Sequence, residues 1–148
     1  MKIGIANDHA ATELKFELVA YLKDKGYEVI NYGTDSSESY DYPIAGETLG
    51  KAVVSKEVEK GIAICGTGVG ISIACNKVKG VRACCCSESE SAKLTRLHND
   101  ANIICFGARI IDFEKAKEIV DTFLTTEFSN EERHIRRIKM ISDIEKGN

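Results

Sequence analysis

Short runs of apolar residues recur along the chain, with little alternation between apolar and polar positions. Such runs are typical of strands that are covered on both faces, as in a parallel sheet. The pattern predicts five strands: Lys2–Asn7, Tyr27–Tyr32, Gly61–Cys65, Val81–Cys86 and Asn102–Phe106.

Segments with helical spacing of apolar residues lie between these runs. The segment Thr12–Lys25 places its leucines on one stripe, and Gly26 follows it as a residue that commonly ends helices. Pro43 suits the first position of a second helix that extends to about Ser55. The pattern therefore predicts a helix after each of the first two strands.

Three later helices are predicted from residues that cap helix N-termini. Ser87 with Glu90 and Ser129 with Glu132 both fit the capping-box pattern, and Asp112 can cap a helix between them. Each of these positions is followed by apolar residues at helical spacing. The last of the three helices ends the chain.

Alternating strands and helices with short connections predict one α/β domain over residues 1–148. We expect a doubly wound, Rossmann-like or flavodoxin-like fold, with a five-stranded parallel sheet, helices on both faces and a C-terminal helix. Five strands favour the order 2-1-3-4-5. In such a sheet, ligands bind at the carboxyl ends of the strands where the winding reverses, here between the first and third strands.

The composition excludes several classes of protein. With 43% hydrophobic residues, 29% charged residues and a net charge of −3, the chain lacks the basic character of nucleic-acid-binding domains. It has no run of about 18 apolar residues for a membrane span, and its start is too weakly apolar for a signal peptide. We expect a cytoplasmic protein whose six cysteines are reduced thiols.

Two clusters of polar or reactive residues follow the two strands that flank the predicted crevice. Asn7, Asp8 and His9 end the first strand, and the third strand ends in Cys65, which the loop 66–70 (GTGVG) follows. The carboxyl ends of parallel strands meet at one edge of the sheet, so we expect these clusters to converge. Asp8 alone also suits a helix N-cap, and that alternative stays open.

The glycine loop does not match a nucleotide-binding motif. Its third glycine comes one position early for a dinucleotide fingerprint, and no Walker lysine follows. Its backbone N–H groups can hold a phosphate or an oxyanion, although a plain strand-to-helix turn also explains the glycines. A cysteine in this position is often only a small buried hydrophobe. We favour a site, because a helix N-terminus stabilises thiolates and the last residue of a parallel strand faces the crevice.

Candidate anion-binding residues lie further along the chain. Arg133 and Arg137 are four residues apart on one helix face and can clamp an anion, although a solvated charged face is the alternative. Arg109 follows the fifth strand and points toward the same crevice edge. His98 lies near the end of the fourth predicted helix, where it can also complement the helix dipole.

The remaining five cysteines do not form a metal-binding pattern. They show no C-x-x-C spacing and no pairing with histidine, so we expect core thiols and no metal. These residues are Cys75, Cys84, Cys85, Cys86 and Cys105.

Four segments carry a resemblance to a known family. "CGTGVGISIA", "HNDAN", "FGARI" and "ERHIRR", in this order and spacing, resemble ribose-5-phosphate isomerases of the B type. The wider family includes galactose-6-phosphate isomerase subunits. The similarity runs essentially from end to end of the chain.

The resemblance implies an aldose–ketose isomerase that interconverts ribose 5-phosphate and ribulose 5-phosphate through an enediolate, with no cofactor and no metal. Cys65 would be the base that moves a proton between C1 and C2. The implied catalytic residues are Cys65, Thr67, His98 and Asp8, of which His98, helped by Asp8, opens the furanose ring. The loop residues implied to stabilise the enediolate oxygens are Gly66, Thr67, Gly68, Val69 and Gly70. Asn99 would hold sugar oxygens. The residues implied to bind the phosphate are His9, Arg109, Arg133 and Arg137.

Three other functions remain as alternatives. The nearest is isomerisation of a six-carbon sugar phosphate, galactose 6-phosphate or allose 6-phosphate. His98 favours ribose 5-phosphate, because galactose-type subunits generally lack that histidine. A non-catalytic phosphate- or nucleotide-binding module would not need the Cys65 thiol, and a thiol-redox protein would need a C-x-x-C pair.

The order of elements places two candidate residue groups away from the crevice. Helices of this fold run opposite to the strands, so the fourth helix ends, and the last helix begins, at the edge opposite the crevice. His98 is then badly placed for its own chain's site. We therefore expect a homodimer or tetramer whose sites for a small-molecule sugar phosphate are shared between subunits.

Overall fold

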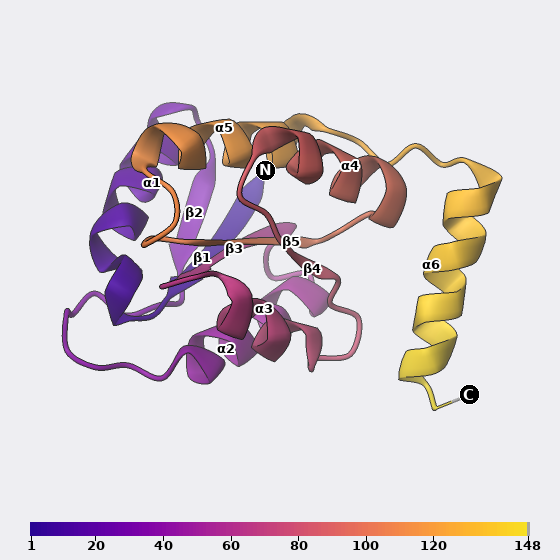
Figure 1. Ribbon diagram of the computed structural model, residues 1–148, viewed down its shortest axis with the longest axis horizontal. Coiled ribbons are helices and arrows are strands. Elements are labelled where there is room, and N and C mark those ends of the chain that lie inside the picture. The colour runs from indigo at the N-terminus through magenta and orange to yellow at the C-terminus, as the bar shows by residue number, and fades with distance from the viewer. Residues whose placement is uncertain (148) are drawn as a thin grey trace.

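The computed structural model describes residues 1–147 and shows a three-layer α/β arrangement (Figure 1). One face of the sheet is covered by α1 (Thr12–Asp24), α4 (Ser89–Asn99) and α5 (Phe113–Thr125). The other face is covered by α2 (Tyr42–Val54) and α3 (Val69–Asn76). This is the predicted fold class, with helices on both faces of the sheet.

The sheet has five parallel strands, and all five predicted strands are confirmed. Their bounds are β1 (Lys2–Asn7), β2 (Glu28–Asn31), β3 (Lys60–Cys65), β4 (Ala83–Cys85) and β5 (Ile103–Gly107). The apolar runs around β2 and β4 are longer than the strands that they form. The carboxyl ends of β1 and β3 lie side by side, as the crevice hypothesis requires.

The predicted strand order 2-1-3-4-5 is wrong in its last two places, because the observed order is β2-β1-β3-β5-β4. All residues of β5 are buried, which suits an inner strand, whereas β4 has two half-buried residues and one exposed residue and forms the edge. The chain thus passes to the edge and then returns inward. Right-handed crossovers then place α3 and α4 on opposite faces.

The double cover of the sheet explains the continuous apolar runs. In β3, Ile62 and Ile64 pack into the core beneath α1 and α5, while Ala63 and Cys65 belong to the core on the side of α2. Successive side chains of a strand point to opposite faces, so both faces need apolar residues. Cys65 is the last of these core positions before the chain leaves the sheet.

Helix termini follow the sequence only in part. Asp112 caps α5 as predicted, since its Oδ1 accepts from the N–H of Lys115 at 2.9 Å. The predicted cap at Ser87 is wrong: α4 begins two residues later, and the carboxylate of Glu88 accepts from the N–H of Ser91 at 2.8 Å. A charged acceptor makes the stronger bond at this helix end.

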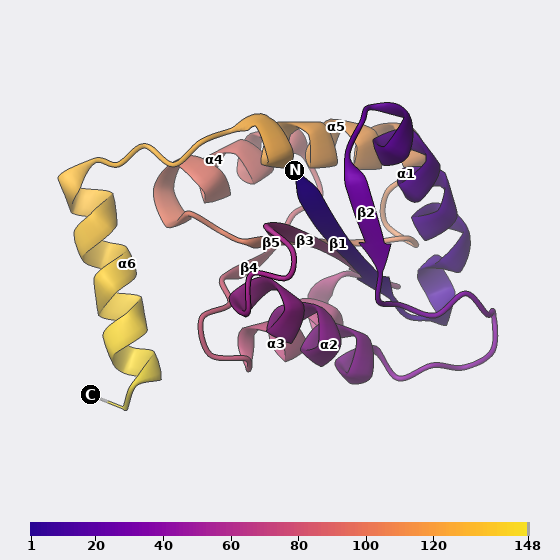
Figure 2. The same ribbon diagram turned by 180° about the vertical axis from the view of Figure 1, so that it is seen from behind.

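The last helix, α6 (Glu132–Glu145), stands beside the α/β body in both views (Figures 1 and 2). Its residues contact α4, and the carboxylate of Glu145 accepts from the N–H of Gly80 at 3.0 Å. The predicted capping box at its start is wrong, because the Ser129 hydroxyl instead pairs with His134 at 2.7 Å. Along residues 1–147, no helix has the length and apolar character needed to cross a membrane.

Candidate active site

A pocket of about 370 Å³ lies at the carboxyl ends of β1, β3 and β5. Its lining residues are Asp8, Tyr42, Cys65, Gly66, Thr67, Val69, Gly70 and Arg109. Asp8 of the first predicted cluster therefore meets Cys65 and the glycine loop of the second in one crevice, whereas Asn7 and His9 are not part of its lining. The change in strand order leaves this crevice intact, because β1 and β3 remain neighbours.

Cys65 sits at the base of the pocket with its side chain oriented by backbone groups. It is 4% exposed, and its Sγ accepts a hydrogen bond from the N–H of Gly68 at 3.1 Å. Its carbonyl oxygen accepts from the N–H of Ala108 at 2.9 Å, which ties the strand end to the β5–α5 connection. An N–H that donates to sulfur stabilises a thiolate more than a thiol.

The glycine loop is held rigidly against the end of β5. Gly68 has a φ of +83°, and a Cβ at this position would lie 2.6 Å from the carbonyl carbon of Phe106. Gly107 faces the loop with equally little room, since its Cβ would lie 2.5 Å from Thr67. The loop then leads into α3, so its N–H groups lie at the N-terminus of a helix, the positive end of the helix dipole. This geometry provides preorganised donors for a developing negative charge.

Arg109 and Tyr42 form two walls of the crevice. The N–H of Arg109 donates to the carbonyl of Gly66 at 3.0 Å, and its guanidinium lies directly against this glycine. On the other side, the ring of Tyr42 covers Gly70, where a Cβ would lie 2.7 Å from the ring. Sequence reasoning did not include Tyr42, and the only local signal was an aromatic residue before Pro43 at a helix start.

Asp8 has two roles in the structure that the sequence treated as alternatives. Its Oδ1 accepts from the N–H of Ala10 at 3.0 Å, capping the 3-10 turn His9–Ala11, and the same residue lines the pocket. His9 lies next to it, and its Nδ1 receives the N–H of Tyr40 at 3.0 Å. Only Nε2 of this ring therefore remains available to a ligand.

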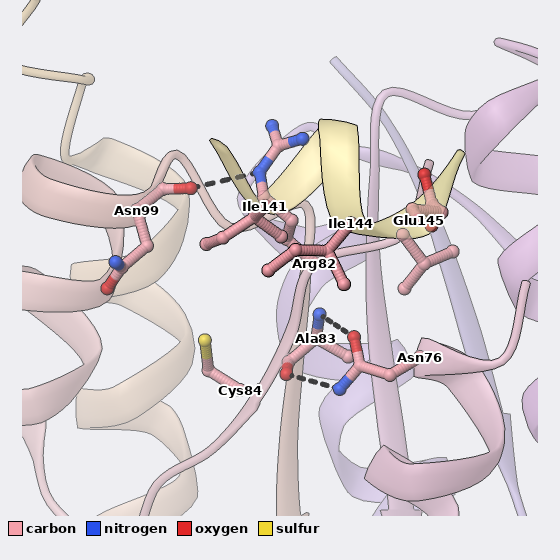
Figure 3. A pocket seen from close by; sticks show the side chains of 9 residues that line it. Asn76, Arg82, Ala83, Cys84, Asn99, Ile141, Ile144 and Glu145 are labelled. Carbon is pink, nitrogen blue, oxygen red and sulfur yellow. Dashed lines mark hydrogen bonds between the residues drawn. The ribbon is translucent and has the colours of Figure 1, made fainter. Parts of the chain in front are cut away.

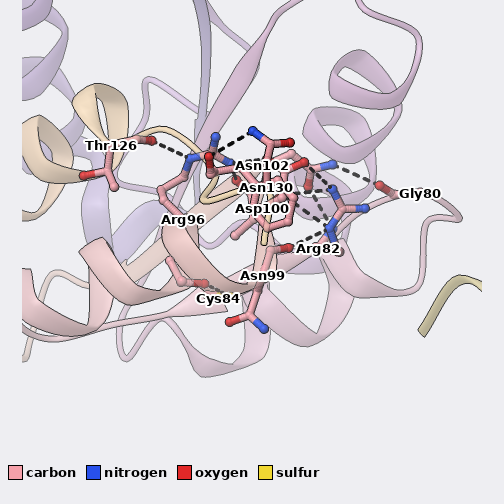
Figure 4. A network of polar contacts seen from close by, with 12 residues as sticks. Gly80, Arg82, Cys84, Arg96, Asn99, Asp100, Asn102, Thr126 and Asn130 are labelled. Atoms are coloured by element: carbon pink, nitrogen blue, oxygen red, sulfur yellow. Dashed lines mark hydrogen bonds and ion pairs between the residues drawn. The ribbon is translucent and has the colours of Figure 1, made fainter. Parts of the chain in front are cut away.

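His98 and Asn99 lie at the opposite edge of the sheet. They end α4, and only three residues separate Asn99 from the start of β5, whereas the crevice lies where β5 ends. A strand of this length separates the two edges by about 13 Å. Figure 4 shows Arg82, Arg96 and Asp100 bonded together here, with the carbonyl of Asn99 accepting from Nε of Arg82 at 3.0 Å.

Arg133 and Arg137 are also remote from the crevice. Both are exposed on α6, and His134 between them is buried and stacked on His98 with ring centroids 4.5 Å apart. Burial lowers the pKa of His134, and the neighbouring His98 and Arg133 lower it further. One chain thus carries two groups of candidate residues at opposite edges of its sheet.

The other cysteines take no part in the crevice lining. Cys75, Cys86 and Cys105 are buried as expected, whereas Cys85 is exposed and departs from the expectation of core thiols. Burial raises the pKa of Cys86 to about 12, so this thiol stays protonated at neutral pH. Throughout the described part of the chain, no cluster of three or more metal-ligating side chains occurs.

Comparison with known proteins identifies the family. The family model described as Ribose/Galactose Isomerase matches residues 3–141. The chain belongs to the ribose/galactose isomerase family. The isomerase family member ribose-5-phosphate isomerase B of Escherichia coli (strain K12) is 49% identical over 144 residues, covering 97% of this chain and 96% of that protein.

Solved structures of the ribose/galactose isomerase family share the fold over nearly the whole chain. The ribose-5-phosphate isomerase B of Clostridium thermocellum has a TM-score of 0.97 and 50% identity, with 99% of each chain covered. The enzyme of Mycoplasma genitalium, solved with bound ribulose-5-phosphate, has a TM-score of 0.94 and 37% identity, with 99% of this chain and 97% of that chain covered.

Proposed function

We propose that this chain is an aldose–ketose isomerase that interconverts ribose 5-phosphate and ribulose 5-phosphate. The observation that carries the proposal is the contact of the Cys65 sulfur with the backbone N–H of a glycine loop, inside a crevice that also holds Asp8 and Arg109. A base and preorganised donors at one edge of a sheet suit a reaction that develops negative charge on oxygen.

Proton transfer begins at Cys65. Its thiolate takes the proton from C2 of the open-chain aldose, and the electron pair moves to the carbonyl oxygen on C1, giving an enediolate. The proton on O2 then moves to O1, for which the hydroxyl of Thr67 is the nearby carrier in the pocket lining. Cys65 returns its proton to C1 as the C2 carbonyl forms, so that no atom or electron is gained or lost.

The loop 66–70 stabilises the enediolate. Its N–H groups are fixed before substrate arrives, because Gly68 and Gly107 leave the loop no room to shift toward β5. Each preorganised donor of this kind contributes roughly 10²–10³ in rate, and a positioned base contributes roughly 10²–10⁴. These contributions require no organic cofactor.

Ring opening and phosphate binding are assigned to residues from both edges. Arg109 and His9 of one chain, together with Arg133 and Arg137 of a second copy, would hold the phosphate. His98 of the second copy, with Asp8, would open the furanose ring, and Asn99 would hold sugar oxygens. The separation of the two edges supports this sharing, because one chain cannot bring its own His98 to its own Cys65.

A second groove supports docking of another copy. It has a volume of about 480 Å³ and lies between α6 and the body, beside Asn99 (Figure 3). Ile141 and Ile144 line it and are 48% and 73% exposed. Exposed apolar side chains next to polar site residues are typical of an interface. We therefore propose a homodimer or larger homo-oligomer, working in the cytoplasm, where its six free thiols stay reduced.

The test is conversion of ribose 5-phosphate in excess EDTA by wild type, Cys65→Ala and Cys85→Ala. The Cys85 variant is the matched control, because its exposed thiol lies near the carbonyl of Thr67 outside the pocket lining. We expect turnover by wild type and the control, and a loss of roughly 10²–10⁴-fold in Cys65→Ala. An inactive wild type would direct the search to six-carbon sugar phosphates. Full activity in Cys65→Ala would refute the assigned base.

A further inference from the structure

Lys15 is a buried cation that the proposed reaction does not use. Its side chain is fully buried, and its Nζ donates to the carbonyl of Thr34 at 2.7 Å, to Oδ1 of Asp35 at 2.5 Å and to Oδ1 of Asn31 at 3.3 Å. Burying an ammonium group is costly unless it is paired and fully hydrogen-bonded. Here all three donors of the ammonium group are satisfied.

Two of the three partners of Lys15, Thr34 and Asp35, belong to the loop 33–41, the longest polar connection in the sequence, and the third, Asn31, ends β2. Two further side chains bind the same loop from the crevice side. Nδ2 of Asn7 donates to the carbonyl of Thr34 at 3.1 Å, and Oγ1 of Thr12 donates to the carbonyl of Ser36 at 2.8 Å. The Thr34 carbonyl therefore accepts from Lys15 and Asn7 together, which fixes the start of the loop against the end of β1.

The other end of the loop fixes His9. The N–H of Tyr40 donates to Nδ1 of His9 at 3.0 Å, which is shorter than the 3.4 Å from the same ring atom to the Tyr40 carbonyl. A backbone N–H can only donate, so Nδ1 acts as the acceptor and the ring proton resides on Nε2. Two residues later the chain reaches Tyr42, which forms a wall of the pocket.

We propose that Lys15 is a positioning residue of the isomerase: through the loop 33–41 it holds the Tyr40 N–H on His9, so that His9 presents Nε2–H to the sugar phosphate. The inference rests on the proposed function, in which His9 binds the phosphate. It assigns a task to the polar loop and to the buried cation that otherwise have none. The depressed pKa of Asp35, caused first by its hydrogen bond with Lys15, fits an ion pair that persists at neutral pH.

The test compares Lys15→Met and Asp35→Asn with wild type, and uses Lys51→Met as the control. Lys51 is an exposed lysine of α2 that is paired with Glu47, away from the loop. We expect the KM for ribose 5-phosphate to rise about 10-fold in Lys15→Met and about 3-fold in Asp35→Asn, with kcat changed less than about twofold, because charge-assisted hydrogen bonds are weakened without touching the reacting atoms. The control should behave as wild type.

A second measurement reads His9 itself. The chain has three histidines, so ¹⁵N spectra of the imidazoles can be assigned with a His9→Gln variant. Wild type should show the Nε2–H tautomer at His9, whereas Lys15→Met and Asp35→Asn should each show a mixture of tautomers. Titration with inorganic phosphate should perturb the His9 signal at lower concentration in wild type than in the variants.

Several outcomes would overturn the inference. Wild-type KM together with an unchanged His9 tautomer in the folded variants would do so, and so would a fall in kcat at constant KM. If Lys15→Met does not fold, Asp35→Asn still decides the test. The Asp35 side chain is 64% exposed, so its replacement does not change the packing of the core. If wild type does not isomerise ribose 5-phosphate, the proposed function fails, but the tautomer and phosphate titrations still decide the role of Lys15.

Discussion

The two edges of the sheet are built in different ways. At the carboxyl edge, Cys65, the glycine loop and Arg109 enclose a pocket and bond to one another. At the opposite edge, the ring of His98 packs against that of His134 in α6, and Arg133 and Arg137 are exposed on the same helix, outside the crevice lining. In the proposed function, the crevice edge carries out proton transfer, and the opposite edge presents its groups to the crevice of a second copy.

Hydrogen bonds also hold together the edge of the sheet that carries His98, opposite the crevice. Nη1 of Arg96 donates to the carbonyl of Ala101 at 2.6 Å and to Oδ1 of Asp100 at 2.8 Å. The N–H of Ser129 donates to the carbonyl of Leu97 at 3.2 Å, which ties the start of α6 to the end of α4. These bonds connect the segment that carries His98 with the segment that leads into α6, as the proposed insertion into a neighbouring chain's crevice requires.

After the loss of the Cys65 base itself, the largest effect is expected from a change that disturbs only the glycine loop of the crevice. Gly68→Ala should lower kcat by roughly 10²–10³, because the new Cβ would displace the loop donors from the enediolate. Gly26→Ala is the matched control: Gly26 also has a positive φ, +94°, but no atom lies within 4 Å of its added Cβ. That control should cost roughly 1–2 kcal/mol of stability, because alanine disfavours a positive φ, and should leave kcat unchanged. Equal losses of activity in both would contradict the assigned role of the loop.

A smaller effect is expected when one of the two α6 arginines proposed to bind the phosphate is removed. Arg133→Ala and Arg137→Ala should each raise the KM for ribose 5-phosphate by about 10-fold, with a smaller change in kcat, since each removes a charge-assisted bond to phosphate. Lys139→Ala serves as the control, because Lys139 lies on a different side of α6 and pairs with Asp143. A KM as low as that of wild type in both arginine variants would remove α6 from the phosphate site.

The smallest expected effect is a pH dependence of folding stability that comes from His134. The pKa of His134 is lowered in the folded chain, so the unfolded chain binds a proton first as the pH falls below about 6.5. The stabilisation is therefore present above this pH and is lost as the pH falls toward the folded pKa. Denaturant unfolding at pH 7.5 and 5.5 should show a larger loss for wild type than for His134→Gln. Identical losses would show that His134 does not carry this dependence.

Local patterns in the sequence predicted the elements well but not their order across the sheet. The apolar runs that contain β4 and β5 look alike as strings, so periodicity found both strands. Which of them lies inside depends on burial by distant helices, which covers all of β5 and leaves Cys85 of β4 exposed. The cap predicted at Ser87 failed because Glu88 competes for the same helix end, whereas the cap predicted at Asp112 is confirmed.

The candidate site divides in the same way. Asp8, Cys65 and Arg109 could be placed in the crevice because each follows a strand, and strand ends converge by topology alone. Tyr42 could not be found in this way, because its contact with Gly70 joins the start of one helix to the first turn of another. The hydrogen bonds of Lys15 to the loop 33–41 could not be predicted either, because they join segments that are distant in the sequence.

The central claim is that each active site combines Cys65 of one copy with His98 of another. Its most direct test is complementation between Cys65→Ala and His98→Ala chains. Each homodimer should be nearly inactive, because each lacks one residue at every site. Mixed dimers, isolated with two different affinity tags, contain one site with both residues intact and should recover about half of wild-type activity. Mixed dimers no more active than their parents would contradict a site shared between the two edges.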